Sequence, residues 1–159
     1  LKTLDGKVHA APAVILADLA RFAAQPMPVA DELLLIGRRH VRSNNSWMHN
    51  YHRLVKGKPR HQLHMHPDDL ASRQLADGQW VRVSSRIGMI EVEVVASLDM
   101  MPGVVSLPHG WGHGRPGVQM SIASGQPGAS ANDLTDERQL DELSGNAALN
   151  GVPVQVAAA

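Results

Sequence analysis

The sequence contains no cysteine and few aromatic residues. The absence of cysteine excludes disulfides, iron–sulfur ligation by this chain and thiol nucleophiles. It leaves the cellular compartment open, because a chain without disulfides can function in any of them. Aromatic residues make up 3 % of the 159 residues, so Val, Leu, Ile, Ala and Met must build the core. The hydrophobic fraction of 43 % excludes a disordered chain and suits one domain with a core.

Net charge and long hydrophobic runs are also absent. The 15 basic and 15 acidic residues balance, which argues against non-specific binding to nucleic acid or to an anionic membrane. No apolar stretch approaches the ~20 residues of a membrane span, so we expect no membrane insertion. The first residues, LKTLDGKVHA, lack the regions of a signal peptide and do not begin with Met. We therefore expect an internal part of a longer protein.

Short apolar stretches separated by Gly and Pro predict a mainly β chain with a few short helices. We predict strands at 7–10, 33–36, 62–65, 80–84, 89–95, 104–107 and 152–156. We predict helices at 13–24, which Pro26 and Pro28 would end, at 67–75 and at 133–143. Many short strands with few helices indicate a barrel or a sandwich.

The apolar run Leu33–Ile36 leads into a loop that is dense in donors and acceptors. The loop contains Arg38, Arg39, Arg42, Ser43, Asn44, Asn45, Ser46, His49 and Asn50. A strand that ends in such a loop is a common site for a polar, anionic ligand, but this segment alone fits a solvated basic turn equally well. Because the whole chain is neutral, the local positive charge is better matched to one anionic ligand.

A second loop alternates glycine with large side chains, in the order His109, Gly110, Trp111, Gly112, His113. Glycine permits positive φ and a close approach of the backbone to a ligand, and successive N–H groups can bind an oxyanion. No Lys-Ser/Thr pair follows, which excludes a P-loop. Trp111 could stack on a flat heterocycle or close the end of a barrel.

Two smaller patterns leave alternatives open. Asn132 and Asp133 could pair with the edge of a pterin or guanine, or could simply cap a helix. His61, His64 and His66 could hold a metal ion, but they fit a surface strand and a helix start better. We therefore predict no metal site. We also predict no catalytic residue, because the sequence contains no nucleophile elbow and no local signature of a Ser/His/Asp triad.

Eight short segments occur together in the order and spacing of one known family: LIGRR at 35–39, RSNNSWMHN at 42–50, HPDD at 66–69, DG at 77–78 before the strand at 81–84, MPGVV at 101–105, PHGWG at 108–112, NDLT at 132–135 and LSG at 143–145. Together they resemble the C-terminal molybdopterin dinucleotide-binding domain of the superfamily of dimethyl sulfoxide reductase, formate dehydrogenase and nitrate reductase. The resemblance divides the chain into a lead-in segment, 1–30, and that domain, 31–159.

The resemblance implies a double-psi β-barrel that binds the pterin and pyrophosphate part of bis(molybdopterin guanine dinucleotide) and closes the active site. It assigns cofactor contacts to three groups: Gly37, Arg38, Arg39, Arg42, Ser43, Asn44, Asn45, His49 and Asn50; His109, Gly110, Trp111 and Gly112; and Asn132 and Asp133. Arginine suits pyrophosphate because it gives charge-assisted hydrogen bonds.

The resemblance also implies that other domains supply the molybdenum ligand and the iron–sulfur cluster. The chain would then be a fragment of a bacterial oxidoreductase, inactive alone, with the preceding domains and a small redox substrate as partners. We expect a cytoplasmic location, or a periplasmic one if an export signal lies upstream. Two alternatives stay open: a small stand-alone enzyme with Ser43 or Ser46 as nucleophile, and a non-catalytic module that binds protein or nucleic acid.

Overall fold

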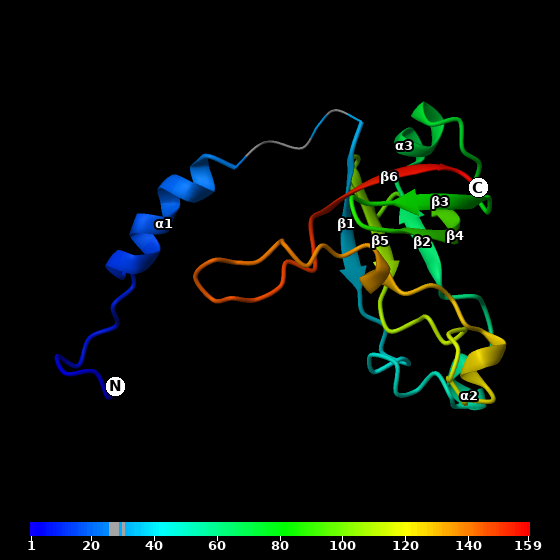
Figure 1. The fold of residues 1–159 in the computed structure, drawn as a ribbon, viewed down its shortest axis with the longest axis horizontal. Coiled ribbons are helices and arrows are strands. Elements are labelled where there is room, and N and C mark those ends of the chain that lie inside the picture. The colour runs from blue at the N-terminus through cyan, green and yellow to red at the C-terminus, as the bar shows by residue number, and fades with distance from the viewer. Residues whose placement is uncertain (26–28, 30) are drawn as a thin grey trace.

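The computed structural model describes residues 1–25, 29 and 31–159. Pro26 and Pro28, predicted to end the first helix, lie outside this part. Figure 1 shows a barrel of strands with long loops at one end, and a helix near the N-terminus that lies apart from the barrel. The mainly β prediction is confirmed.

Six strands form the barrel: β1 (Leu33–Arg38), β2 (Gln62–Met65), β3 (Trp80–Ser84), β4 (Met89–Ala96), β5 (Val104–Pro108) and β6 (Val152–Ala158). Three α-helices and two 3₁₀ turns complete the described elements: α1 (Ala13–Ala23), α2 (His52–Val55), α3 (Pro67–Ser72), η1 (Ala123–Gly125) and η2 (Ala131–Asp133). The six strand predictions from 33 onward agree with the observed strands to within two residues at each end.

Two predicted elements are wrong. Residues 7–10 form no strand, because they are exposed and pair with no described strand. Residues 133–143 form turns instead of a helix. Asp136 accepts a hydrogen bond from the backbone N–H of Arg138, and Asp141 accepts one from that of Ser144. Such local side-chain bonds compete with the helical pattern.

The strands close in the order β1-β5-β2-β4-β3-β6. The pairs β1–β5 and β2–β4 are parallel, and the four other pairs are antiparallel. Each parallel pair joins strands that are not consecutive along the chain. This crossed, closed six-stranded arrangement is the double-psi β-barrel that the family resemblance implies.

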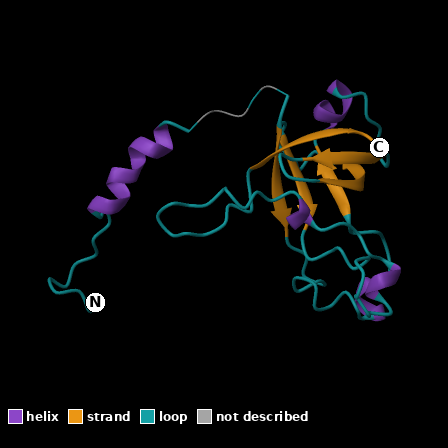
Figure 2. Ribbon diagram, viewed as in Figure 1, coloured by secondary structure: helices purple, strands orange, loops and turns teal. Residues whose placement is uncertain are grey.

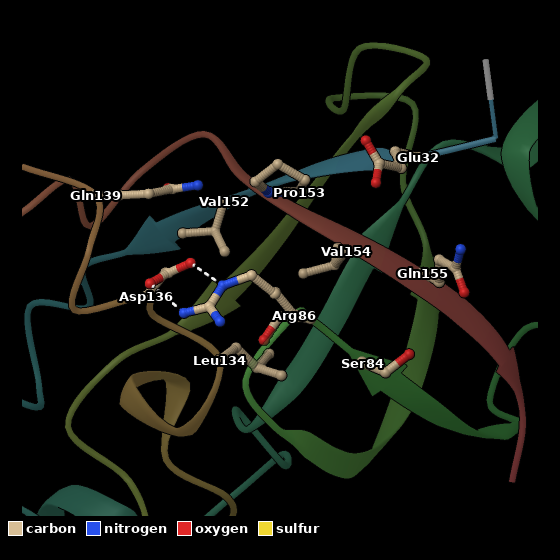
Figure 3. Close-up of a pocket in the computed structure, with 11 residues that line it drawn as sticks. Glu32, Ser84, Arg86, Leu134, Asp136, Gln139, Val152, Pro153, Val154 and Gln155 are labelled. Atoms are coloured by element: carbon tan, nitrogen blue, oxygen red, sulfur yellow. Dashed lines mark hydrogen bonds and ion pairs between the residues drawn. The ribbon is translucent and has the colours of Figure 1, made fainter. Parts of the chain in front are cut away.

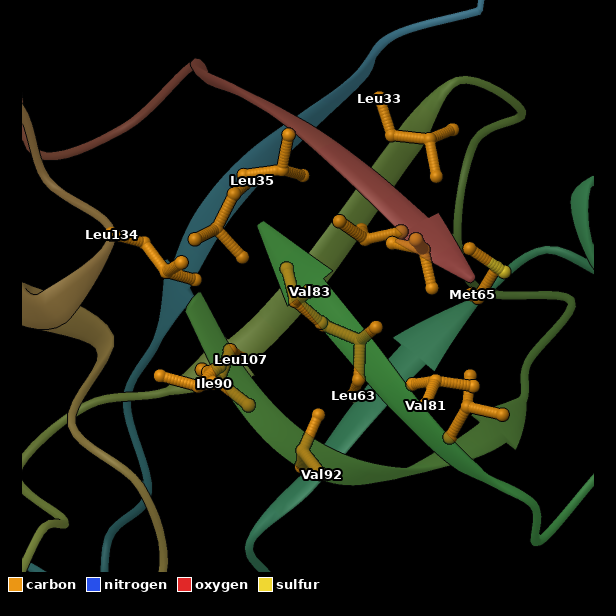
Figure 4. Packing of buried hydrophobic residues seen from close by; sticks show 14 of the residues in the cluster. Leu33, Leu35, Leu63, Met65, Val81, Val83, Ile90, Val92, Leu107 and Leu134 are labelled. Carbon is orange, nitrogen blue, oxygen red and sulfur yellow. The ribbon is translucent and has the colours of Figure 1, made fainter. Parts of the chain in front are cut away.

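The core lies inside the barrel and is aliphatic (Figure 4). Along β3, Val81 and Val83 point inward and pair with Val92 and Ile90 of β4, while the side chains between them face solvent. This alternation follows the two-residue period of a strand. Leu134, from the turn after η2, is fully buried and closes one end of the core. The prediction of a core without aromatic residues is confirmed for the barrel.

The parallel pairing of β1 with β5 positions the loops. Arg38 at the end of β1 is in register with Pro108 at the end of β5. Parallel strands end at the same side of a sheet, so the loops that follow both strands leave the barrel together. Figure 2 shows these loops gathered beside α2 at one end of the barrel. Residues from the two predicted ligand loops are thereby brought side by side.

The helix α1 contributes no buried residue, and its apolar side chains are exposed. Its Arg21 lies 3.9 Å from Asp141 and 3.6 Å from Glu142, both in the turn region before β6. Within the described part of the chain, no helix has the length and apolar character needed to cross a membrane.

Candidate functional site

Positive charge is concentrated in the segment that holds the first loop. Residues 33–67 contain seven of the fifteen Lys and Arg residues and no Asp or Glu: Arg38, Arg39, Arg42, Arg53, Lys56, Lys58 and Arg60. None of these seven side chains forms an ion pair with a described residue. A neutral chain thus presents a local cationic surface without internal counter-ions.

Arg38 is the most constrained of these cations. Its guanidinium is half-buried at the end of the barrel and donates to the carbonyls of Ser106, at 2.9 Å, and Gln62, at 2.8 Å. Burial lowers the pKa of Arg38. A partly buried cation without a carboxylate partner is unfavourable, so this position favours an anion.

The loop after β1 is held in a specific turn. Asn44 and Asn45 have positive φ of 41° and 62°, a region in which Asn is better tolerated than most residues. The side-chain oxygen of Asn45 accepts a hydrogen bond from Arg39. Arg42 is exposed at the same turn. The predicted ligand residues of this loop thus include two cations at its surface.

Beneath the loops lies a second group, which we call the histidine–tryptophan cluster: the buried residues His49, Trp111 and His113, and the half-buried His61. His49 is 1 % exposed and stacks on Trp111, which is 9 % exposed, with ring centroids 4.1 Å apart. Nδ1 of His49 lies 2.8 Å from Nε2 of His113. His49 and Trp111, predicted to contact a cofactor, therefore pack against each other under the loops.

The surroundings of the cluster favour the neutral form of its histidines. Burial, with smaller effects of His113 and Arg60, lowers the pKa of His49 to about 4. Burial also lowers the pKa of His113 and of His61. The His61 ring bonds to the backbone of Ala129, with Nε2 2.9 Å from its oxygen.

Gly110 and Gly112 bring loops of the chain close to each other. A Cβ on Gly110, where φ is +89°, would lie 2.5 Å from the carbonyl oxygen of Asn45. A Cβ on Gly112, where φ is +110°, would lie 3.0 Å from Cβ of Ser130. The glycines therefore permit a close approach of the backbone, as predicted, but the group approached is another loop of the chain.

Asn50 and Ser43 also have internal roles. The side-chain oxygen of Asn50 accepts from the backbone N–H groups of Ile122 and Ala123, at 3.0 and 3.1 Å. Ser43 is buried, and its carbonyl accepts from the N–H of Met48. Within the described residues, neither Ser43 nor Ser46 has a side-chain hydrogen bond to a base, so nothing activates either one as a nucleophile.

Four predicted site residues meet at one cavity of about 150 Å³: Gly37, Arg39, His109 and Asn132. Its other lining residues are Leu35, Ile36, Ala131, Thr135, Leu149 and Asn150. The cavity therefore combines apolar walls with a cation and two amides, which suits a flat polar ligand.

The sequence prediction missed Asn150. Its side-chain oxygen accepts from the N–H of Gly37 at 2.8 Å, across 113 residues of sequence. No local pattern marks this residue, because its contact depends on the pairing of β6 with β1. Asn132 is exposed at the cavity, whereas Asp133 pairs with Arg115. The residue that caps η2 is Ser130, and not Asn132 or Asp133.

A larger cavity of about 490 Å³ lies beside β6 (Figure 3). Arg86 spans it and donates two hydrogen bonds to Asp136, one of them 2.7 Å long. These bonds, and to a smaller extent the bond from the backbone N–H of Arg138, lower the pKa of Asp136 to about 2. The cation of this cavity is already neutralised, so the smaller cavity is the better anion site.

The histidines considered for a metal do not converge. His61 is bonded to Ala129, and His66 caps α3 by accepting from the N–H of Asp68. The described residues contain no group of three or more side chains placed to hold a metal ion.

Comparisons with known proteins identify the family of this chain. A family model described as the molydopterin dinucleotide binding domain matches residues 33–153. A tetrathionate reductase subunit of Salmonella typhimurium is 27% identical over 121 residues, which are 65% of this chain and 12% of that protein.

The structure of acetylene hydratase from Pelobacter acetylenicus superposes with a TM-score of 0.64 at 21% identity, over 91% of this chain and 20% of that one. This chain thus spans only a small part of the length of either protein. Because the family match runs from β1 into β6 and includes every loop of the site, the chain belongs to the molydopterin dinucleotide binding domain family.

Proposed function

We propose that this chain is the C-terminal domain of a molybdopterin-dependent oxidoreductase, where it binds the pterin and pyrophosphate part of bis(molybdopterin guanine dinucleotide) and closes the active site. The observation that carries the proposal is Arg38, a half-buried cation that is held by two carbonyls and forms no ion pair with a carboxylate of the described residues. An anionic ligand would supply the missing counter-charge.

The residues at the end of the barrel fit such a cofactor. Arg38, Arg39 and Arg42 can give charge-assisted hydrogen bonds to pyrophosphate. Asn132 and Asn150 offer amide groups that match the mixed donors and acceptors of a pterin or guanine edge. The apolar walls of the smaller cavity can pack against the face of the ring.

The role of this chain is to bind and orient the cofactor and to exclude water. When bound, the cofactor supplies the redox chemistry. We infer that preceding domains of a longer polypeptide provide the molybdenum ligand and the iron–sulfur cluster and contact the substrate. The isolated chain should therefore be inactive. We retain the cytoplasm as the expected location, with the periplasm as the alternative.

The test is cofactor retention by the complete enzyme that carries this domain. Arg38→Met should weaken cofactor retention about tenfold, because it removes hydrogen bonds to a charged group. Asn132→Ala should also weaken cofactor retention. Because the Asn132 side chain is exposed, this change removes no contact within the barrel. The measurements are molybdenum content and released guanine nucleotide per folded protein.

The matched control is Arg53→Met. Arg53 is an exposed cation in α2 and belongs to the same segment, 33–67, that contains no Asp or Glu. The change should leave cofactor content unchanged. Full cofactor content in both Arg38→Met and Asn132→Ala would show that the proposed site is wrong.

A further inference from the structure

Besides the packing of His49 on Trp111, a buried contact between two histidines joins the two ligand loops. Nδ1 of His49 lies 2.8 Å from Nε2 of His113, and the rings meet edge to face with centroids 5.1 Å apart. The side chains are 1 % and 7 % exposed. His113 was not among the predicted site residues, and its partner is 64 residues away in sequence.

The contact requires a particular protonation state. Two neutral imidazoles can share one hydrogen bond, with one ring as donor and the other as acceptor. If both rings are protonated, both nitrogens are donors and the bond is lost. In addition, Nε2 of His49 is buried without a hydrogen-bond partner among the described residues.

Among the described residues, the backbone of Gly110 raises the pKa of His49, but burial, His113 and Arg60 lower it by more. The titratable groups that act on His49 are His113, Arg60 and His109. The ring of His61 packs against the same Trp111 ring, with centroids 5.4 Å apart. All are basic, and none of the described groups that act on either ring is a carboxylate. Burial and positive neighbours therefore both favour the neutral rings.

We propose that His113 is a positioning residue of the cofactor site: while both rings are neutral, its hydrogen bond to His49 holds the loop that carries Arg39 and Arg42 against the loop that carries His109. This inference rests on the proposed function, because it assumes that the two loops bind one anionic ligand. Because the bond holds both loops in position before the ligand binds, binding costs less conformational entropy.

The proposal predicts an unusual effect of pH. Added positive charge near an anion site should, by electrostatics alone, strengthen anion binding. If the His49–His113 bond positions the loops, protonation of both rings instead weakens binding, because the bond between them is then lost. The direction of the pH effect therefore separates a positioning role from a merely electrostatic one.

The bond itself can be tested in the unaltered chain by nitrogen-15 NMR of the histidine rings. We expect both rings to be neutral at pH 7.5, with one ring donating to the other through one shared proton. A protonated ring at that pH, or two tautomers without a shared proton, would refute the contact. This measurement depends neither on a variant's folding nor on the cofactor.

The positioning role is tested by calorimetric binding of inorganic diphosphate to the chain. His113→Phe keeps the ring shape and should weaken binding about tenfold at pH 7.5, the loss expected for one hydrogen bond. His113→Gln offers an amide near the position of Nε2 and should restore most of the affinity. The ratio of wild-type to His113→Gln affinity should fall on acidification, and protonation of the diphosphate cancels in this ratio.

His9→Phe is the matched control, since His9 is exposed in the segment before α1, and it should bind as the wild type does. Equal diphosphate binding by wild type and His113→Phe would overturn the positioning role but leave the proposed site intact. Failure of the wild-type chain to bind diphosphate, with the shared proton present, would instead overturn the proposed site and the positioning role with it.

Discussion

Gly110→Ala is expected to destabilise the protein by roughly 2–4 kcal/mol. The new Cβ would lie 2.5 Å from the carbonyl oxygen and 2.7 Å from the carbonyl carbon of Asn45. These are backbone atoms, which cannot move aside as a flexible side chain can. The φ of +89° adds strain, because residues with a Cβ rarely adopt it. Chemical denaturation measures the loss.

Gly117→Ala separates the two causes. Gly117 has the same φ of +89°, but nothing lies within 4 Å of its Cβ position. It should show only the strain, roughly 1–2 kcal/mol. The excess loss in Gly110→Ala then measures the close approach of the two loops. Equal losses in the two variants would mean that these loops are not in contact at Asn45.

The titration of His49 alone is expected to reduce the free energy of unfolding by about 2 kcal/mol when the pH is lowered from 7 to 5. Burial, followed by the effects of His113 and Arg60, lowers the pKa of His49 from 6.5 to about 4 in the folded state. As the pH falls below 6.5, the unfolded chain takes up the proton first, so unfolding is favoured. The stabilisation is complete above pH 6.5 and is lost progressively toward pH 4.

The pH effect is measured by denaturation at a series of pH values. His49→Phe should flatten the curve, because the titrating ring is removed. His52→Phe, a change at an exposed position of α2, should retain the wild-type slope. His113 and His61 add to the wild-type slope in the same direction, since burial lowers their pKa as well. A slope unchanged by His49→Phe would contradict the assignment.

Local patterns were reliable where a strand has one buried face. The alternation at 80–84 and 89–95 predicted β3 and β4, because side chains on a strand point in turn to the core and to solvent. The helix predicted at 133–143 failed for a reason that is also local. Its aspartates bond to nearby backbone N–H groups, which its spacing of apolar residues does not reveal.

The candidate site was predictable in part. The family pattern named Arg39, His109 and Asn132, which the structure brings to one cavity. It also named Trp111, whose ring the structure buries against His49. A sequence pattern identifies residue types that suit a ligand, but the same types can support a loop from within. Only burial distinguishes the two roles.

By itself, the sequence determined the mainly β class, the aliphatic core and the acid-free cationic segment, because these follow from composition and from short-range periodicity. Tertiary structure alone decided which residues meet. The bond from Arg38 to Ser106, the pair of His49 with His113 and the contact of Asn150 with Gly37 join residues that are 64 to 113 positions apart. Closure of the barrel, with β1 parallel to β5 and antiparallel to β6, sets these distances, and local sequence patterns do not encode it.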